Sequence, residues 1–491
     1  MTSLASTPQP ASGPGIAARV RSAVVWRWGS QVLGQVITWT ATILVVRLLE
    51  PHDYGLFAMS QAVLVALNFL NGYSYATSLI QAEEVDARRV SQVFGLLIVS
   101  NLILAAAQLV LAPYAAAYYG QPVVADMLRV QALVFLTTPF IALPSALLAR
   151  RIEFRSQALI TLGCSLLGAG VALGLAWAGH GVWALVLAPI AMFAARAIGL
   201  TFAARLLVWP SFDFRGARDV IGFGTALTLC QLFWIVQSQA DVFIAGRAFA
   251  PHDLGLYSEA LFLTLIFTGR FLPPLNEVAF PAYAELAKSG QPLAPAFLHS
   301  ARLTMLVAAP LYVGLSLSAG PLVATLFGPK WLEMIPLVAG LALAMPAMAL
   351  QIVCSPATNA LSRPRIYLQS SLAGALLMPL GYLIGVRFGP LGLVHAWQVA
   401  APVLLAITLA LTLPVVGARL GELARALLPV GAATAAMALA VALFDRVVAG
   451  AVPAPLHLAL LVATGGVTYG AALLLGWPQV VRDTWAVLFR K

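Results

Sequence analysis

The stretch Arg47-Leu-Leu-Glu-Pro-His-Asp-Tyr-Gly-Leu56 returns 200 residues later as Arg247-Ala-Phe-Ala-Pro-His-Asp-Leu-Gly-Leu256, with six of ten positions identical. Each copy stands between two apolar segments, at the same kind of junction. A match at one fixed offset and in one structural context indicates internal duplication. The stretch therefore predicts a chain built from two related units.

The segments around the motif are apolar throughout the chain. Of the 491 residues, 61% are hydrophobic and 9% are charged, whereas soluble domains carry about 25% charged residues. An α-helix needs on the order of 20 apolar residues to cross a hydrocarbon core. Windows of that length predict fourteen transmembrane helices, near residues 28–48, 55–80, 90–112, 124–148, 157–178, 183–206, 220–246, 254–281, 299–326, 335–360, 367–386, 391–415, 424–444 and 456–476.

The predicted fold is an all-α polytopic membrane protein with two parallel six-helix repeats and two extra C-terminal helices. Six is an even number, so both repeats insert the same way round. The predicted parts are a disordered cytoplasmic tail at 1–25, a first lobe at 26–208, a linker at 209–219, a second lobe at 220–416, and two further helices with a cytoplasmic tail at 417–491.

Basic residues orient these helices. Twenty of the 28 Lys and Arg residues fall on one side of the predicted membrane, and only Arg47, Arg129, Arg247, Lys330, Arg387 and Arg446 fall on the other. The positive-inside rule then places both termini in the cytoplasm, and we refer to the other side as the predicted outer side. The net charge of +10 is mostly topological, and we expect no nucleic-acid partner.

Motifs for cofactors, metals and nucleotides are missing. None of the three lysines ends a G-x-x-x-x-G-K-[ST] loop, and Cys164, Cys230 and Cys354 lie in apolar segments without ligand spacing. The repeated Pro-His-Asp is better interpreted as a helix start, with Asp53 and Asp253 as N-caps, than as a catalytic site. We therefore expect no cofactor, no metal and no enzymatic activity.

Several further motifs, in order, resemble one known family. They are Tyr75-Ala-Thr-Ser-Leu-Ile-Gln81, Leu143-Pro-Ser-Ala-Leu-Leu-Ala-Arg-Arg-Ile-Glu-Phe154, Gly181-Val-Trp-Ala-Leu185, Ser238-Gln-Ala-Asp241 and Gly328-Pro-Lys-Trp-Leu332. The chain resembles the Wzx-type flippases, the polysaccharide-transporter branch of the multidrug/oligosaccharidyl-lipid/polysaccharide (MATE-like) exporter superfamily.

That resemblance implies a function and partners. Such proteins move undecaprenyl-diphosphate-linked oligosaccharides from the cytoplasmic to the periplasmic leaflet of the bacterial inner membrane, for exopolysaccharide, capsule or O-antigen assembly. The implied partners are this polyprenyl-diphosphate-linked oligosaccharide, membrane lipids, and the polysaccharide polymerase and chain-length machinery. A MATE-like drug/cation antiporter and a membrane-embedded polysaccharide polymerase or ligase remain alternatives.

Three arginines are candidates for binding a diphosphate. Arg196 lies near the middle of the sixth predicted helix, and Arg270 lies deep in the eighth, before Pro273-Pro274, which should break or kink it. Arg27 stands at the predicted cytoplasmic mouth between two tryptophans. The Arg fork matches phosphate oxygens. The alternatives are structural ion pairs for Arg196 and Arg270 and an interfacial anchor for Arg27.

Two acids, Asp241 and Glu259, are candidates for ion coupling near the outer ends of the seventh and eighth helices. In distant relatives, the lipid II flippases, an acid on helix seven joins polar groups of helices eleven and twelve in a cation site. Helix eleven here offers Gln369, Ser370 and Ser371 and no acid, so sodium coupling does not follow. The alternative is that Asp241 pairs with Arg247 or another polar group.

The duplication and the extra helices predict where the substrate lies. Helices one, two, seven and eight should line a central cavity that carries Arg270. The last two helices, near 424–444 and 456–476, have no counterpart in the repeat. We expect them to form a lateral apolar groove for the polyprenyl tail.

Overall fold

The computed structural model describes residues 16–73, 75–76, 79, 86–150, 154–205, 208–213, 233 and 235–482. Every regular element in this part of the chain is a helix, and no strand occurs there. Nine helices within it are long and apolar enough to cross a membrane. The chain is therefore an all-helical, multi-pass membrane protein. The predicted total of fourteen spans and the repeat layout stay predictions.

Internal contacts divide the chain into two compact units. Unit 1 comprises Met1–Val45, Leu67–Leu111 and Met127–Thr228, and unit 2 comprises Val46–Ala66, Ala112–Asp126 and Leu229–Lys491. The division does not follow sequence order, because two short pieces from the first third of the chain belong to unit 2. Each unit is described by itself.

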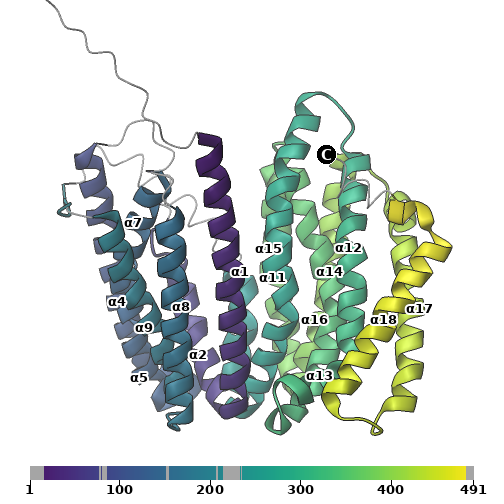
Figure 1. Cartoon of the computed structure of the whole chain (residues 1–491), viewed down its shortest axis with the longest axis horizontal. Coiled ribbons are helices and arrows are strands. Elements are labelled where there is room, and N and C mark those ends of the chain that lie inside the picture. Colours follow the sequence, from purple (N-terminus) through teal and green to yellow (C-terminus); the bar gives the residue numbers. More distant parts are fainter. Residues whose placement is uncertain are drawn as a thin grey trace, which may run out of the picture. The chain divides into compact units, whose positions relative to one another are not determined.

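Unit 1 is a helical bundle whose members run side by side (Figure 1). Its core contains Leu97, Leu143 and Ala146 in one cluster, and Leu148 and Leu200 in another. The helices that contribute to it, wholly or in part, are α1 (Ile16–Leu48), α4 (Ala87–Tyr119), α5 (Pro122–Gln131), α6 (Leu133–Thr137), α7 (Pro139–Arg150), α8 (Phe154–Trp177) and α9 (Trp183–Ala204).

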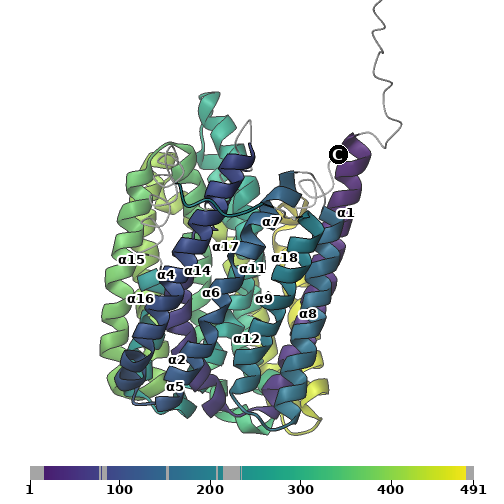
Figure 2. The same cartoon turned by 90° about the vertical axis from the view of Figure 1, so that its left-hand side faces the viewer.

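Unit 2 is built around α14, which packs against α11, α12 and α16. Figure 2 shows α15 and α16 side by side, and α17 packs on α18. Besides α2 (Pro51–Asn68), its helices are α11 (Pro251–Lys288), α12 (Ala294–Leu317), α13 (Ala319–Leu326), η1 (Pro329–Met334), α14 (Ile335–Ala360), α15 (Pro364–Gly385), η2 (Val386–Phe388), α16 (Gly389–Val416), α17 (Leu420–Val448) and α18 (Ala454–Gly476).

Two predicted boundaries at the N-terminal end are wrong. Helix α1 begins at Ile16, so the disordered tail expected at 1–25 does not extend over residues 16–25. Helix α2 ends at Asn68, inside the predicted span 55–80. Asn71 donates a side-chain hydrogen bond to Asn68, and Gly72 has a φ of +73°. Asn side chains compete with the helical ladder and Gly accepts a left-handed conformation, which together end the helix.

Prolines act differently in two predicted spans. The fourth span is divided into α5, α6 and α7, and Pro139 starts the last piece because it cannot donate to the helical ladder. Of the break or kink predicted at Pro273-Pro274, no break occurs, since α11 runs unbroken to Lys288. Membrane helices tolerate proline where neighbouring groups satisfy the freed backbone. One such case is α14, where Asn276 of α11 donates to the Ile352 carbonyl that Pro356 leaves without its helical donor.

The two copies of the repeated motif open α2 and α11, each with proline in the first turn. The prediction that Asp53 and Asp253 are N-caps is wrong by three positions. Ala250 is the N-cap of α11, and both acids lie within the first turn. Asp53 accepts a hydrogen bond from the Glu50 backbone N–H at 3.2 Å. An acid there still stabilises the helix, because it complements the positive end of the dipole.

Candidate functional site

Arg270 lies on the exposed side of α11 in unit 2. Its neighbour Phe271 is 58% exposed, whereas Phe267 and Leu272 are buried in the unit. Arg270 makes no hydrogen bond or ion pair with any residue in the described part of the chain. The structural ion pair considered from the sequence is therefore not formed there. A guanidinium with five unused donors is free to bind an external anion.

Arg196 lies in unit 1, on α9, where it is half-buried. Its Nε atom is buried without a hydrogen-bond partner among the described residues. Its described electrostatic neighbour is the thiol of Cys164 on α8. An unpaired buried donor is costly unless water or a ligand satisfies it.

Arg27 falls within α1, but its side chain and those of Trp26 and Trp28 lie outside the described residues. The choice between an entry contact and an interfacial anchor therefore stays as the sequence left it.

Asp241 lies in the helical segment 235–248 of unit 2 and is 1% exposed. One carboxylate oxygen accepts the Tyr257 hydroxyl at 3.0 Å, and the other accepts the Val242 backbone N–H at 2.8 Å. The Tyr257 oxygen in turn accepts the Trp397 indole N–H at 2.9 Å. The result is a buried chain of hydrogen bonds that joins the segment 235–248, α11 and α16.

The groups considered as partners of Asp241 are engaged elsewhere. The Arg247 guanidinium stands 5.0 Å from the centre of the Tyr118 ring, a cation–π contact. On α15, the Ser370 hydroxyl is hydrogen-bonded to Thr408 of α16 at 2.8 Å. Within the described residues, no three His, Cys, Asp or Glu side chains gather as a metal site would require. Asp241 is thus held by two neutral donors, the Tyr257 hydroxyl and the Val242 backbone N–H.

Glu259 lies one helical turn after Gly255 on α11 and is half-buried. Its charge reaches Tyr54 of α2, but it forms no hydrogen bond or ion pair within the described part of the chain. The two acids therefore differ: Asp241 has all its nearest partners in place, and Glu259 has an unused carboxylate.

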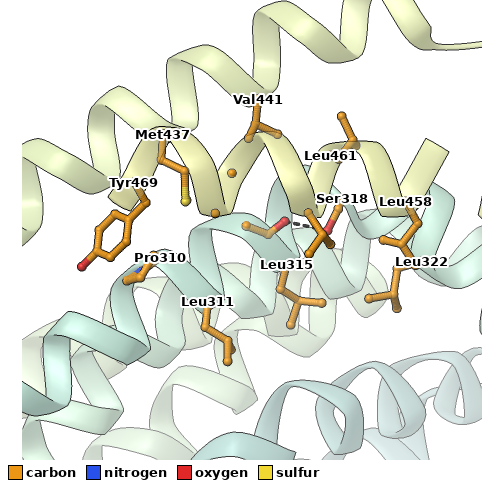
Figure 3. Close-up of a pocket in the computed structure, with 14 residues that line it drawn as sticks. Pro310, Leu311, Leu315, Ser318, Leu322, Met437, Val441, Leu458, Leu461 and Tyr469 are labelled. Atoms are coloured by element: carbon orange, nitrogen blue, oxygen red, sulfur yellow. Dashed lines mark hydrogen bonds between the residues drawn. The ribbon is translucent and has the colours of Figure 1, made fainter. Parts of the chain in front are cut away.

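A groove of about 460 Å³ lies between α12–α13 and α17–α18 (Figure 3). Met437, Val441 and Leu461 are buried in it, while Leu311 and Val462 are exposed at 40% and 62%. From Leu458 to Tyr469 the groove follows α18 for roughly 17 Å at 1.5 Å per residue. The predicted apolar groove beside the last two helices is therefore present.

The groove offers almost no polar group to a ligand. The Ser318 hydroxyl donates to the Gly314 carbonyl at 2.7 Å, and the Tyr469 hydroxyl donates to the Leu306 carbonyl at 2.8 Å. Since these hydroxyl protons are used internally, the surface left open is aliphatic. A hydrocarbon chain would bind there without leaving a polar group unsatisfied.

Comparisons with known proteins assign the chain to a family. Residues 44–336 match the model of the polysaccharide biosynthesis protein family, and the chain belongs to it. It is 25% identical over 272 residues to the teichuronic acid biosynthesis protein TuaB of Bacillus subtilis (strain 168), covering 55% of this chain and 56% of TuaB. It is 25% identical over 300 residues to the succinoglycan biosynthesis transport protein ExoT of Rhizobium meliloti (strain 1021), covering 61% of each. The chain thus spans less than two thirds of either relative.

The fold is also found among solved structures. The lipid II flippase MurJ in an inward closed conformation matches with a TM-score of 0.75 at 11% identity, covering 94% of this chain and 100% of MurJ. At that identity the likeness concerns the fold alone. Family and fold together agree with the resemblance seen in the sequence: the chain is a member of the polysaccharide biosynthesis protein family and has the fold of a lipid flippase.

Sequence reasoning missed the residues that hold Asp241. Tyr257 directly follows the second copy of the repeated motif, where a tyrosine 16 residues from an acid is a weak signal. Trp397 is a single aromatic residue in an apolar span, 140 residues from Tyr257. Nothing in its local sequence indicates a polar partner.

Proposed function

We propose that this chain is a flippase that moves polyprenyl-diphosphate-linked oligosaccharides, of the undecaprenyl class, from the cytoplasmic to the periplasmic leaflet. It would act in exopolysaccharide, capsule or O-antigen assembly, in the bacterial inner membrane with both termini in the cytoplasm. Family membership and the names of the relatives TuaB and ExoT support this class of substrate.

The apolar groove of α12, α13, α17 and α18 is the observation that carries the proposal. Its length of roughly 17 Å exceeds half of a hydrocarbon core of about 30 Å, and its lining is almost entirely apolar. A long polyprenyl tail needs such a path because it cannot enter water while its head group crosses. In this proposal α17 and α18, which have no counterpart in the predicted repeat, serve to bind the polyprenyl tail.

The head group is the proposed ligand of the arginines. Arg270 and Arg196 each have donors without a partner in the described structure, and a guanidinium binds two phosphate oxygens at once. Arg27 is proposed as a contact at the cytoplasmic entrance. Asp241 and Glu259 are proposed to couple transport to ions. Glu259 is the better candidate, because its carboxylate has no hydrogen-bond partner among the described residues.

The alternatives receive less support from the described residues. A drug/cation antiporter would need an acid open to its substrate. Asp241 is buried and already accepts two hydrogen bonds, which leaves Glu259 as the one of the two candidate acids that could serve. A polymerase or ligase would need a catalytic constellation, and the sequence motifs offer none. The polymerase and the chain-length machinery are proposed as partners of the transporter instead.

The domain plan is proposed as the sequence predicts it. Lobes at 26–208 and 220–416, joined by a linker at 209–219, would move against each other, and residues 417–491 would carry the tail groove and the C-terminal tail. Most of the linker lies outside the described residues.

Flipping in sealed proteoliposomes tests the function. A polyprenyl-diphosphate oligosaccharide with a fluorescent sugar is placed in both leaflets. An impermeant quencher added outside then reports the fraction of this lipid that becomes accessible in the outer leaflet with time. We expect faster exchange with the protein than with empty liposomes, and no competition from organic cations. Exchange at the rate of empty liposomes, together with uptake of a cationic dye, would establish the antiporter instead.

A deletion strain provides the matching cellular test. Loss of the gene should trap repeat-unit lipids in the inner leaflet, and this chain should restore their export. Repeat units that reach the outer leaflet but stay unpolymerised would point to the polymerase alternative.

A further inference from the structure

A short segment after α9 lies across the first turns of α4, within unit 1. We call this segment, Val208-Trp-Pro-Ser-Phe-Asp213, the strap. It has no helical structure. The Ser211 backbone N–H donates to the Ser91 carbonyl at 2.9 Å, and the Gln92 side-chain amide donates to the Asp213 carbonyl at 2.9 Å. The strap is therefore held in place on one helix.

A glycine in α4 permits this close approach. A Cβ at Gly95 would overlap the Ser211 carbonyl oxygen and fall 2.8 Å from its carbon. The obstacle is backbone, so it cannot rotate away as a flexible side chain could. At the start of the strap, Val208 packs against the apolar cluster that contains Phe94 and Leu143. Gly95 thus seats the strap, and Val208 joins it to the core of unit 1.

Two aromatic side chains of the strap are uncovered. Trp209 is 87% exposed and Phe212 is 58% exposed. Neither makes a hydrogen bond or a ring contact with any residue in the described part of the chain. Large apolar groups fixed in such a position are unfavourable in water. An exposed apolar patch of this kind marks a contact with another surface.

The strap lies at the level where α4 passes from polar to apolar residues. Arg88, Arg89 and Gln92 precede an apolar run that begins at Val93. From Arg88 to Gly95 the helix rises about 10 Å, and the head-group layer on each side of the hydrocarbon core is roughly 5–8 Å thick. We therefore expect the strap at the depth of the lipid head groups on the predicted cytoplasmic side, where tryptophan is enriched in membrane proteins.

The charges around the strap are complementary to an anionic surface. Asp213, the one acid of the strap, stands 3.5 Å from Arg88, and Asp86 accepts the Arg89 backbone N–H at 2.8 Å. Both acids are thus engaged within the protein. Against them, the described residues at this end of unit 1 include five arginines, which are Arg88, Arg89, Arg150, Arg155 and Arg205. Anionic lipids of the cytoplasmic leaflet attract basic segments of this kind.

We propose that the strap and the neighbouring arginines form a binding site for anionic phospholipids of the cytoplasmic leaflet, with Trp209 and Phe212 inserted among the head groups. The site uses none of the residues proposed to bind the transported lipid. It would hold the start of the predicted inter-lobe linker, 209–219, at a fixed depth in the membrane. The inference uses only the membrane location of the chain and does not depend on what the chain transports.

The depth of the strap in a bilayer is the first test. The native cysteines of the whole chain are replaced by serine, and Phe212→Cys then carries an NBD fluorophore. The protein is placed in nanodiscs of phosphatidylcholine and phosphatidylglycerol in equal parts, and dithionite destroys the NBD that water reaches. We expect reduction about tenfold slower than at Ser289→Cys, in the exposed loop between α11 and α12. Equal rates at the two positions would overturn the proposal.

A substitution at Gly95 should unseat the strap. Gly95→Val places its side chain against the Ser211 carbonyl, so we expect the reduction of NBD at position 212 to accelerate to the rate of the exposed loop. The matched control is Gly163→Val on α8, where a Cβ would meet nothing within 4 Å. A folded Gly95→Val protein with unchanged reduction would contradict the seating on which the site depends.

Lipid-dependent stability provides a second measurement that needs no change in α4. A ligand that binds the folded protein raises its Tm. In mixed detergent micelles, replacing phosphatidylcholine by phosphatidylglycerol should raise the Tm of the parent, and Trp209→Ala should lose at least half of that increase. Trp177→Ala is the control, because Trp177 is 85% exposed but lies at the other end of unit 1, where α8 ends. An equal increase in Trp209→Ala and the parent, or no increase in the parent, would be evidence against the site.

The measurements also distinguish the other possible occupants of the strap. Neither sample contains a polyprenyl lipid, so the transported substrate cannot account for the result. A cytoplasmic protein would leave the strap open to dithionite in nanodiscs. It would protect the strap in native membrane vesicles until an alkaline wash removes peripheral proteins. That pattern would replace the phospholipid by a protein partner and overturn the proposal.

Discussion

At the scale of single residues, the deep arginines differ from the basic residues that set topology. Arg270 and Arg196 fall inside predicted spans, where a charge costs roughly 2.5 to 3.5 kcal/mol on insertion scales. Neither is compensated by an ion pair in the described structure. Because no described ion pair offsets this free energy, we infer that each arginine binds a ligand.

Replacing Arg270 should therefore impair flipping more than stability. We expect Arg270→Ala and Arg196→Ala to lower the flipping rate by about tenfold or more, since a hydrogen bond to a charged group contributes about 1.5–3 kcal/mol. Lys should rescue only in part, because it lacks the planar fork. The control is Arg387→Ala at the predicted outer surface. Normal flipping by both Ala variants would end the ligand hypothesis, and loss of membrane accumulation would show an architectural role.

The hydroxyl of Tyr257 should contribute to stability through two buried bonds. Tyr257→Phe removes the donor to Asp241 and the acceptor for Trp397, and each group left unsatisfied costs about 1–3 kcal/mol. We expect a lower Tm of the detergent-purified protein, while Tyr367→Phe on the exposed surface of α15 leaves it unchanged. A Tm equal to that of the parent would show that water replaces the hydroxyl.

At the scale of elements, α17 and α18 are joined to the rest of unit 2 mainly through α12 and α13. Their buried residues Met437, Val441 and Leu461 form a separate apolar cluster. The groove lies on this cluster, so its shape is set by four helices and not by one.

Filling the groove should slow flipping without unfolding the protein. Gly466 lines the groove and Gly470 does not, yet a Cβ at either position meets nothing within 4 Å. We expect Gly466→Leu to lower the flipping rate several-fold because its side chain occupies the path of the tail, whereas Gly470→Leu on the same helix should have little effect. Equal rates in the two variants would place the tail elsewhere. Photocrosslinking of a polyprenyl probe to α18 would locate it directly.

At the scale of the whole molecule, the proposed cycle moves charge. A diphosphate lipid carries about two negative charges outward from an electrically negative cytoplasm, and each charge that crosses is worth about 2.3 kcal/mol per 100 mV. If arginines neutralise the head group in the loaded step, the field acts on the empty, positively charged carrier as it returns inward. Whether the charge moves with the loaded carrier or with the empty one, an inside-negative potential favours export of the lipid.

Flipping should therefore respond to membrane potential in the absence of sodium and of a pH difference. In proteoliposomes with an imposed potassium–valinomycin potential, the final distribution of the fluorescent lipid should shift with the sign and size of the potential. Liposomes with valinomycin omitted serve as the control. A distribution that ignores the potential would contradict net charge movement, or would show that counter-moving ions cancel it.

Apolar length, charge bias and the repeated motif are properties that the sequence determines by itself. A run of about 20 apolar residues must cross a bilayer as a helix, because backbone groups cannot stay unpaired in hydrocarbon. For that reason the apolar windows locate most described helices well. The breaks at Asn68–Gly72 and at Pro139, and the continuity of α11 through Pro273-Pro274, were missed because local hydrogen bonds and neighbouring helices decide them.

Only the tertiary structure decided which residues meet. Asp241 obtains its partners from α11 and α16, and Gly55 meets Pro251 across almost 200 residues of chain. The sequence shows that the motif occurs twice. Each copy, taken by itself, predicts only the start of a helix. Packing two helices closely enough for a glycine to touch a carbonyl depends on long-range contacts, which no local pattern encodes.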